Sequence, residues 1–393
     1  MSREFKDIKV SVIIPARNEF PAIVFTVHSI LNDLETFLTP AEFEIIIVAN
    51  CLDDWYQVEK GRRALYGTVD YFSGMGAYWN RVVKFIYDPI AGNHSARNKG
   101  VELARGKYVF MSDAHMSYRV GYFKKMIETI DKTDGLVHAT IGWMGAYPPD
   151  KSCGYQYTVK LGDEIRGTWS NYKLVDDYFY IPMQGHCSLG VKREQFLKFG
   201  GYPKYHRCYG GGEFYLDSKW WMFGSRVSVE PEAIGYHLRS SRGYSYHYED
   251  YIHNVLAIGM ALGMDGWAER AYFFWLRKHS KETMDRLWAE AKKETEEDRK
   301  FIKENSIMSY NDLLVQKPWD KLNDELYGKH NSSLLIFHDT FIPMLKGTPS
   351  EELFNKSETQ KELSKFIEEN LSEHIYKRTK QSEQYVQDVV YKQ

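Results

Sequence analysis

The chain has 393 residues, of which 43% are hydrophobic, 15% aromatic and 26% charged, and its formal net charge at pH 7 is −2. This composition indicates a globular protein with room for a catalytic unit and a smaller second unit, and the near-neutral charge excludes a polycation that coats nucleic acid. The N-terminus lacks the apolar core of a signal peptide, and no apolar run approaches the roughly 20 residues of a membrane-spanning helix, so we expect a cytoplasmic protein without membrane contact.

Four short apolar runs, each closed by polar residues, predict buried strands at residues 10–15, 43–48, 82–87 and 108–111. Apolar residues with helical spacing follow the first run, and another helix opens near residues 96–100. Alternating strands and helices imply right-handed crossovers and a parallel sheet. In such sheets, ligands bind just beyond the carboxyl ends of the strands.

Polar residues gather at these predicted strand ends. The candidates are Pro15, Arg17, Asn18, Glu19, Asn50, Asp53, Asp54 and Arg97. Asn50, Asp53 and Asp54 can hydrogen-bond a base or a ribose, and Arg97 can reach a phosphate. Alternatively, the aspartates are turn residues and Arg97 is a solvated helix charge. No G-x-G-x-x-G follows the first strand and no G-x-x-x-x-G-K-[ST] occurs, so the pattern differs from the common dinucleotide and phosphate-loop folds.

The fourth strand ends in Ser112-Asp113-Ala114-His115. One carboxylate oxygen and one imidazole nitrogen, two residues apart at a strand end, can share a divalent cation. The alternative is a strand followed by an Asx-type turn that leaves His115 exposed.

The second half of the chain carries three further signals. An aromatic region over residues 136–180 predicts strands and long loops on the acceptor side, or an ordinary aromatic core. The next stretch, residues 183–191, contains Gly185 and precedes a predicted helix over residues 193–199. Three glycines precede a helix that places Glu213 and Asp217 on one face at i and i+4. A short strand at residues 227–229 leads to Gly235-Tyr236-His237 and then to a polar loop.

From about residue 249 the pattern becomes helical and carries no chemical motif. We therefore predict two units, a catalytic domain over residues 1–250 and a helical C-terminal region over residues 251–393. The charged runs in this region are typical of solvated helix faces. The four cysteines, Cys51, Cys153, Cys187 and Cys208, match no zinc-binding spacing, and reduced thiols are the simpler interpretation.

Taken in order, the motifs P-A-R-N-E, A-R-N-K-G, R-G-K-Y-V-F-M-S-D-A-H, G-G-G-E with K-W-W, and G-Y-H-L-R resemble the GT-A glycosyltransferases. The resemblance is closest to the branch that includes the polypeptide N-acetylgalactosaminyltransferases with their bacterial and phage relatives, and it covers residues 8–245. It implies an α/β fold, namely a Rossmann-like mixed sheet flanked by helices, here with a helical extension at the C-terminus.

The resemblance also implies roles for individual residues. Asp113, His115 and His237 correspond to the ligands of a metal, Mn2+ or Mg2+, that bridges the diphosphate of a UDP-sugar. Glu213 corresponds to the acid that faces the sugar hydroxyls or the acceptor. If the enzyme inverts the configuration of the sugar, its base is Glu213 or Asp217. If it retains the configuration, as the N-acetylgalactosaminyltransferases do, no dedicated base is needed, and both alternatives stay open. The implied donor-binding residues are Pro15, Arg17, Asn18, Glu19, Asn50, Asp54, Arg97, Ser112, Asp113, Gly185, Arg239 and Arg242.

Arg239 and Arg242 belong to a loop after His237 that we expect to bind the diphosphate and to close over the donor. For the acceptor, the leading hypothesis is a hydroxymethylpyrimidine in phage DNA, engaged by the basic and aromatic stretch 192–207. The alternatives are a glycan, a lipid precursor or a protein hydroxyl. A nucleotidyltransferase is disfavoured by the first turn, and a sugar-nucleotide-binding module without catalysis is the non-enzymatic alternative.

Overall fold

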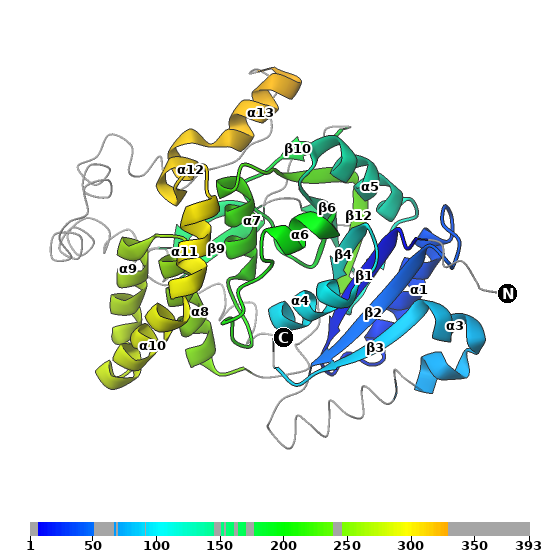
Figure 1. Ribbon diagram of the computed structural model, residues 1–393, viewed down its shortest axis with the longest axis horizontal. Coiled ribbons are helices and arrows are strands. Elements are labelled where there is room, and N and C mark those ends of the chain that lie inside the picture. The colour runs from blue at the N-terminus through cyan, green and yellow to red at the C-terminus, as the bar shows by residue number, and fades with distance from the viewer. Residues whose placement is uncertain are drawn as a thin grey trace, which may run out of the picture.

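The computed structural model describes residues 7–50, 67, 70–90, 92–144, 177–238 and 246–328, together with the backbone of three strands between residues 151 and 169. A mixed sheet forms its centre (Figure 1), with the strand order β10-β12-β6-β11-β4-β1-β2-β3. The bounds are β1 (Val10–Ala16), β2 (Phe43–Asn50), β3 (Val83–Asp88), β4 (Tyr108–Ser112), β6 (Leu136–Met144), β10 (Phe179–Tyr180), β11 (Ser188–Lys192) and β12 (Val227–Leu238).

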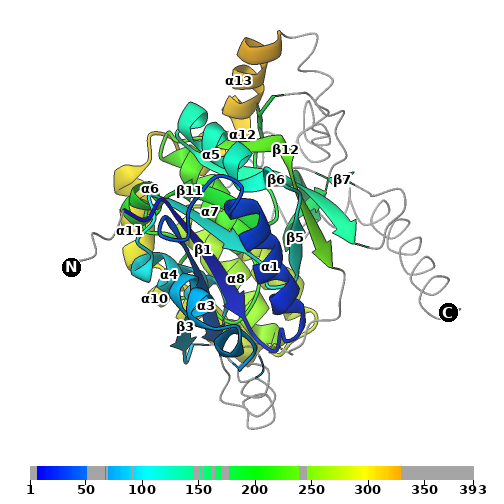
Figure 2. The ribbon, with the colours of Figure 1, turned by 90° about the vertical axis from the view of Figure 1, so that its right-hand side faces the viewer.

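Three further pairings complete the strands. β5 (Met116–Tyr118) pairs with β12, β7 (Lys151–Ser152) pairs with β6, and β8 (Tyr155–Lys160) and β9 (Glu164–Trp169) form a separate two-stranded sheet. Figure 2 shows β5, β6 and β12 running side by side next to α1.

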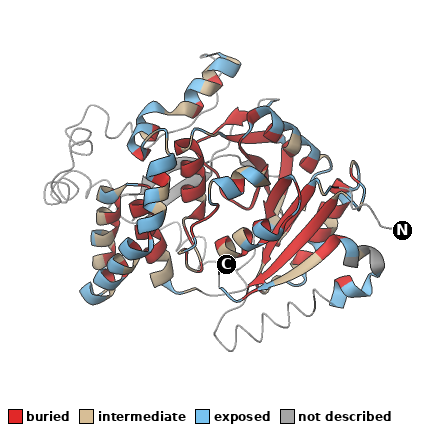
Figure 3. Cartoon of the chain, viewed as in Figure 1, coloured by how far each residue is buried: buried red, intermediate tan, exposed pale blue. Residues whose placement is uncertain are grey.

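Helices cover both faces of the sheet because its central strands are buried on both sides (Figure 3). In β1, Val12 and Ile14 pack with α1 (Ala22–Leu34) and α5 (Tyr122–Thr133). Ile13, between them, joins the opposite core, formed with α4 (Asn93–Leu103), α6 (Arg193–Lys198) and α7 (Gly212–Met222). A short helix, α3 (Ala77–Val82), precedes β3.

The predicted fold class is confirmed: a mixed sheet flanked by helices precedes a helical C-terminal region. The four predicted N-terminal strands are parallel to one another, whereas β11 runs antiparallel to both β4 and β6.

One predicted strand was too short. The apolar pattern indicated residues 227–229, but β12 continues to Leu238. The sequence Glu230-Pro231-Glu232 interrupts the apolar pattern, and a register shift between Glu230 and Ile234 absorbs this interruption. His237 therefore lies in a strand that is paired on both sides, and not in a loop.

The C-terminal helices are α8 (Tyr248–Ala261), α9 (Asp265–Leu276), α10 (Lys281–Glu294), α11 (Glu296–Asn305), α12 (Tyr310–Gln316) and α13 (Pro318–Tyr327). Trp267, Met284 and Leu287 belong to a core that α8, α9 and α10 share. Leu313 and Trp319 instead join the core around α7. The division of the chain near residue 250 stays a prediction. Within the described ranges, no helix combines the length and apolar character that crossing a bilayer requires.

Candidate metal and nucleotide site

The candidate site lies at one edge of the sheet, where four parallel strands end. β1, β2, β3 and β4 run in the same direction, so the polar residues after them reach a common edge. Residues 17–19 follow β1, Asn50 ends β2, Asp88 ends β3 and Asp113 follows β4. Such an edge is where ligands of open α/β sheets bind.

Strand pairing explains how His237 reaches residues more than a hundred positions earlier in the chain. The backbone N–H of Asp113 donates to the carbonyl of Cys187 at 2.8 Å, which anchors the segment after β4. β5 then pairs with β12 so that Met116 lies opposite His237, and the N–H of Leu238 donates to the carbonyl of His115 at 3.0 Å. His115 and His237 are therefore neighbours on adjacent strand ends.

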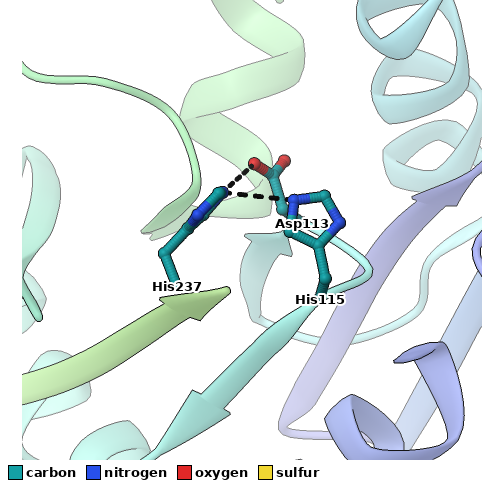
Figure 4. Close-up of side chains that lie close together, drawn as sticks. All are labelled: Asp113, His115 and His237. Carbon is teal, nitrogen blue, oxygen red and sulfur yellow. Dashed lines mark hydrogen bonds and ion pairs between the residues drawn. The ribbon is translucent and has the colours of Figure 1, made fainter. Parts of the chain in front are cut away.

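The side chains of Asp113, His115 and His237 converge on one point (Figure 4). His115 Nε2 lies 3.2 Å from His237 Nε2, and His237 Nε2 lies 3.5 Å from Asp113 Oδ2. One ligand atom from each residue lies within 4.8 Å of the other two. The three side chains are 27%, 20% and 18% exposed, so the cluster is open to solvent on one side. One carboxylate oxygen with two imidazole nitrogens is a donor set that fits a borderline divalent cation.

Two charged residues orient these side chains. Arg97 Nη2 donates to Asp113 Oδ1 at 2.9 Å, and Glu19 Oε2 lies 3.0 Å from His115 Nδ1. Burial raises the pKa of Asp113, but the hydrogen bond with His237 and the charge of Arg97 outweigh it, so that the pKa lies well below its usual value. Because His115 Nδ1 faces a carboxylate, its Nε2 is directed toward His237. The ring of Trp143 contacts His237 edge-on, with 5.4 Å between ring centroids.

The other predicted donor-binding residues, where they are described, lie at or beside strand ends. Pro15 and Gly185 are buried in β1 and in the segment before β11, and Asn18 has a positive φ of 61°. Arg17 Nη1 contacts Cys208 Sγ at 3.1 Å, Asn50 Nδ2 contacts the carbonyl of Gly92 at 3.4 Å, and Ser112 Oγ contacts the carbonyl of Asp113 at 2.8 Å. Asp53, Asp54, Arg239 and Arg242 lie outside the described residues, as do most of the predicted lid loop and the aromatic side chains over residues 155–172.

The glycine-rich turn positions the first residues of α7. Gly210 and Gly211 have φ values of +111° and +76°, which L side chains rarely adopt. At Gly212 a Cβ atom would overlap with Nε2 of the buried His94. The turn therefore places Glu213 in the first helical turn, where it is partly exposed.

Asp217 lies one turn further along α7 and differs sharply from Glu213 in its surroundings. Its side chain is 0% exposed, and His138 and His186 contact its carboxylate. We did not predict either histidine as a site residue. The only local signal is the M-Q-G-H run beside Gly185, because the contacts to Asp217 join segments that are 31 and 79 residues apart.

Four side chains of the basic and aromatic stretch 192–207 are buried or bound to other parts of the chain. Tyr202 and His206 are buried. Arg193 donates to the carbonyls of Val101 and Glu102, and Arg207 pairs with Glu290 at 2.8 Å. These side chains serve packing, and none of these four presents an open surface for stacking a flipped base.

Comparison with known proteins finds a family model and several relatives that are similar to this chain. Residues 11–147 match the family model of glycosyl transferase family 2. The putative polypeptide N-acetylgalactosaminyltransferase 13 of Drosophila melanogaster is 26% identical over 184 residues, covering 40% of this chain and 32% of that protein. The human polypeptide N-acetylgalactosaminyltransferase 10 is 24% identical over 238 residues, or 56% of this chain and 36% of that protein.

A third relative, N-acetylgalactosaminyltransferase 6 of Drosophila melanogaster, is 25% identical over 285 residues, which are 67% of this chain and 39% of that protein. The chain thus spans between 32% and 39% of the length of these curated relatives. The crystal structure of GalNAc-T7 with UDP, GalNAc and Mn2+ superposes with a TM-score of 0.60 at 18% identity, over 80% of this chain and 57% of that chain. Residues 11–147 therefore match a glycosyltransferase family 2 domain, the chain is similar in sequence to polypeptide N-acetylgalactosaminyltransferases, and its fold is the GT-A fold of GalNAc-T7.

Proposed function

We propose that the protein is a metal-dependent glycosyltransferase that moves a sugar from a UDP-sugar to a hydroxyl acceptor. The observation that carries this proposal is the convergence of Asp113, His115 and His237 at the carboxyl ends of the strands in a family 2 domain. The relative with the same fold was crystallised with UDP and Mn2+, which supports the choice of nucleotide and cation.

The residues fit a divalent cation because three mutually close donor atoms, one oxygen and two nitrogens, face one point beside a solvent-open edge. Asp113, His115 and His237 would hold Mn2+ or Mg2+ there. When bound, such a cation stabilises the charge of the departing diphosphate as a Lewis acid.

The side chains around the cluster have separate tasks in this proposal. Arg97 holds the Asp113 carboxylate in one orientation, and Glu19 does the same for the His115 ring. The proposed donor-binding residues are Pro15, Arg17, Asn18, Asn50, Asp54, Ser112 and Gly185, with Arg239 and Arg242 for the diphosphate.

In the transfer, an acceptor oxygen forms a bond to the anomeric carbon while the bond from that carbon to the diphosphate oxygen breaks. The electron pair of the broken bond leaves with the UDP, whose diphosphate gains a negative charge. Without a dedicated base, the proton of the acceptor hydroxyl goes to that diphosphate oxygen. We assign Glu213 to the acceptor side, since it is partly exposed in the first turn of α7. If the reaction inverts the anomeric centre, Glu213 is the carboxylate that takes the acceptor's proton.

For the acceptor, the names of the relatives favour a polypeptide hydroxyl. Hydroxymethylpyrimidine in phage DNA stays a prediction from the sequence. Within the stretch 192–207, Tyr202 is buried and Arg207 pairs with Glu290. A glycan or lipid precursor is a further alternative, and a cytoplasmic site of action also stays a prediction.

The experiment that tests the enzyme is UDP release from a panel of UDP-sugars with and without Mn2+, in the presence of a Ser/Thr peptide or of hydroxymethylated DNA. We expect Mn2+-dependent release by the wild type and none by His237→Ala. Mass spectrometry of peptide and digested nucleosides identifies the acceptor. Binding of UDP-sugars without release in any arm would support the non-catalytic binding module and contradict the proposal.

A further inference from the structure

Beneath the proposed metal site lies a buried polar cluster formed by Asp217 of α7, His138 of β6 and His186 of the segment before β11. All three side chains are fully buried, and one ligand-type atom from each lies within 4.8 Å of the others. Neither the family match nor the donor site accounts for a carboxylate and two histidines at this depth. Their contacts with neighbouring residues indicate which groups they hold in one orientation.

Both oxygens of Asp217 are in use. His186 Nε2 lies 3.0 Å from Oδ1 and His138 Nε2 lies 3.2 Å from Oδ2. The backbone N–H of Gln184 also donates to Oδ2, at 2.8 Å. A carboxylate that accepts three N–H groups and meets no solvent cannot take a proton from an acceptor substrate without losing these bonds. These contacts argue against Asp217 as a base.

His186 is held at three different atoms. Its Nε2 faces Asp217, its Nδ1 lies 2.7 Å from the hydroxyl of Tyr202, and its carbonyl accepts from Arg97 Nη2 at 2.6 Å. Nε2 of His186 faces a carboxylate and Nδ1 faces a hydroxyl, so a ring with its proton on Nε2 alone satisfies both contacts, with Tyr202 donating to Nδ1. Burial, which lowers the pKa of His186, favours this neutral form. The ring has one orientation in which all of these bonds form.

The same arginine reaches the metal cluster. Arg97 Nη2 donates both to the carbonyl of His186 and to Asp113 Oδ1, and its guanidinium is buried. The next residue, Asn98, fixes Tyr202 from the other side: its Nδ2 donates to the carbonyl of Tyr202 at 2.9 Å and its Oδ1 accepts from the N–H of Tyr202 at 3.0 Å. A closed ring of contacts thus runs from Arg97 through His186 and Tyr202 back to Asn98.

We propose that Asp217 is a positioning residue: it fixes His186, the carbonyl of His186 fixes Arg97, and Arg97 sets the orientation in which Asp113 binds the cation. The inference rests on the proposed function, since it concerns the cation site of the proposed enzyme. It also gives the A-R-N motif a structural role, because its arginine and its asparagine hold opposite ends of the same ring of contacts.

A second metal ion at the buried cluster is the competing interpretation. Against it, each facing atom of Asp217, His138 and His186 already has a hydrogen-bond partner within the cluster. A divalent cation with a single carboxylate would also leave a net positive charge buried near Arg97, which is costly. The test below includes this outcome.

The test compares Asp217→Asn with Glu44→Gln, a matched control. Glu44 is equally buried and accepts from Ser11 and from the N–H of Arg105, each at 2.8 Å, but it lies near the opposite end of β2 from Asn50. Titration of Mn2+ by electron paramagnetic resonance gives the dissociation constant, and thermal unfolding gives stability. We expect a loss of affinity of about 10-fold in Asp217→Asn, the size seen when outer partners of metal ligands are removed. Glu44→Gln should lose stability while binding Mn2+ normally.

Folded Asp217→Asn with wild-type Mn2+ affinity would overturn the inference alone, whereas a wild type that binds no Mn2+ would overturn the proposed function with it. If Asp217→Asn does not fold, Tyr202→Phe removes only the hydroxyl bound to His186 and should weaken Mn2+ binding by a smaller factor. Unchanged affinity in Tyr202→Phe would then count against the inference.

Two further measurements separate positioning from general stability and from a second metal. Nitrogen-15 spectra of the histidines should show His186 protonated on Nε2 alone in the wild type and altered in Asp217→Asn. Elemental analysis of His237→Ala should find no tightly held metal. One equivalent of metal retained in His237→Ala and lost in Asp217→Asn would place an ion at the buried cluster and contradict the inference.

Discussion

At the scale of single residues, the candidate metal site includes side chains that are not themselves proposed ligands. Glu19 and Arg97 each touch one proposed ligand, at 3.0 Å and 2.9 Å, and each leaves the ligand atom of that residue pointing toward His237. A histidine that is free to rotate or to change tautomer binds a metal less well, because part of the binding free energy is spent on ordering it.

This reasoning gives a prediction for Glu19. Glu19→Gln should keep the shape of the side chain but lose the charge that favours a proton on Nδ1 of His115, and Mn2+ affinity should fall by about 10-fold or more. Titration of Mn2+ measures the change, and the exposed Glu102→Gln on α4 is the control, which should bind as the wild type does. Unaltered affinity in Glu19→Gln would show that His115 needs no such partner.

A second residue-scale prediction concerns Gly212. Alanine there would bring Cβ against the ring of the buried His94, and His94 has backbone and ring neighbours that prevent its retreat, including Tyr202 with ring centroids 4.8 Å apart. Overpacking of this kind costs about 1 to 3 kcal/mol. Gly212→Ala should therefore lower the free energy of unfolding in urea by that amount, whereas Gly74→Ala, where a Cβ meets no atom within 4 Å, should leave it nearly unchanged.

At the scale of elements, the first half of the sheet was predictable and the site-forming strand pair was not. β1, β2, β3 and β4 are short apolar runs with polar ends, and local patterning is enough to find them. β5 has three residues and β12 contains Pro231, so neither has a clear local pattern. His237 was placed with the metal ligands through family resemblance, since the pairing of β5 with β12 is set by contacts across the whole domain.

The buried histidines show the same limit. His138 and His186 are buried and have no spacing in the sequence that marks a site. The two histidines form a polar cluster only because both contact the carboxylate of Asp217 on α7. Helical spacing predicted that Glu213 and Asp217 share a face, but which of the two meets solvent depends on how α7 packs.

A prediction at the element scale concerns three buried histidines: His94 of α4, His206 of the segment between α6 and α7, and His253 of α8. His94 of α4 contacts His206, with 3.2 Å between the two Nδ1 atoms, and His253 lies in the buried part of α8. Burial, with smaller effects from the charges of His253 and Lys219, lowers the pKa of His206 from 6.5 to about 3. Burial also lowers the pKa values of His94 and His253.

The direction in which stability changes with pH follows from the number of protons that the folded and unfolded chains bind. Between pH 6.5 and pH 3 the unfolded chain protonates His206 and the folded chain does not, so stability falls as the pH falls through this window. A shift of this size corresponds to roughly 3 to 5 kcal/mol. Urea unfolding across the window should show a shallower pH dependence for His206→Phe than for the wild type. The exposed His247→Gln should follow the wild type, and identical slopes for His206→Phe would contradict the prediction.

At the scale of the whole molecule, part of the helical region shares a core with the sheet. Trp319 of α13 and Leu313 of α12 pack in the cluster that contains Trp221 and Phe214 of α7. Asn323 of α13 also completes the edge of the sheet, because it donates to the carbonyl of Tyr180 in β10 and accepts from the N–H of Tyr180, each at 2.8 Å. The sequence predicted helices here, but gave no sign that they would close a sheet edge, since this requires a partner 143 residues away.

This shared core predicts that the described part of the chain unfolds in one step. Removing the buried Trp319 side chain in Trp319→Ala should cost about 3 to 5 kcal/mol, and Asn323→Ala should cost about 1 to 3 kcal/mol because it leaves two buried backbone groups of β10 unpaired. Since α12 and α13 contact α7 directly, both losses should lower the midpoint for the sheet as well as for the helices. Calorimetry combined with Trp fluorescence measures this, and Val315→Ala, at a side chain 76% exposed, is the control. Two separate transitions in Trp319→Ala, with the sheet melting at the wild-type temperature, would show that the helical region is an independent unit.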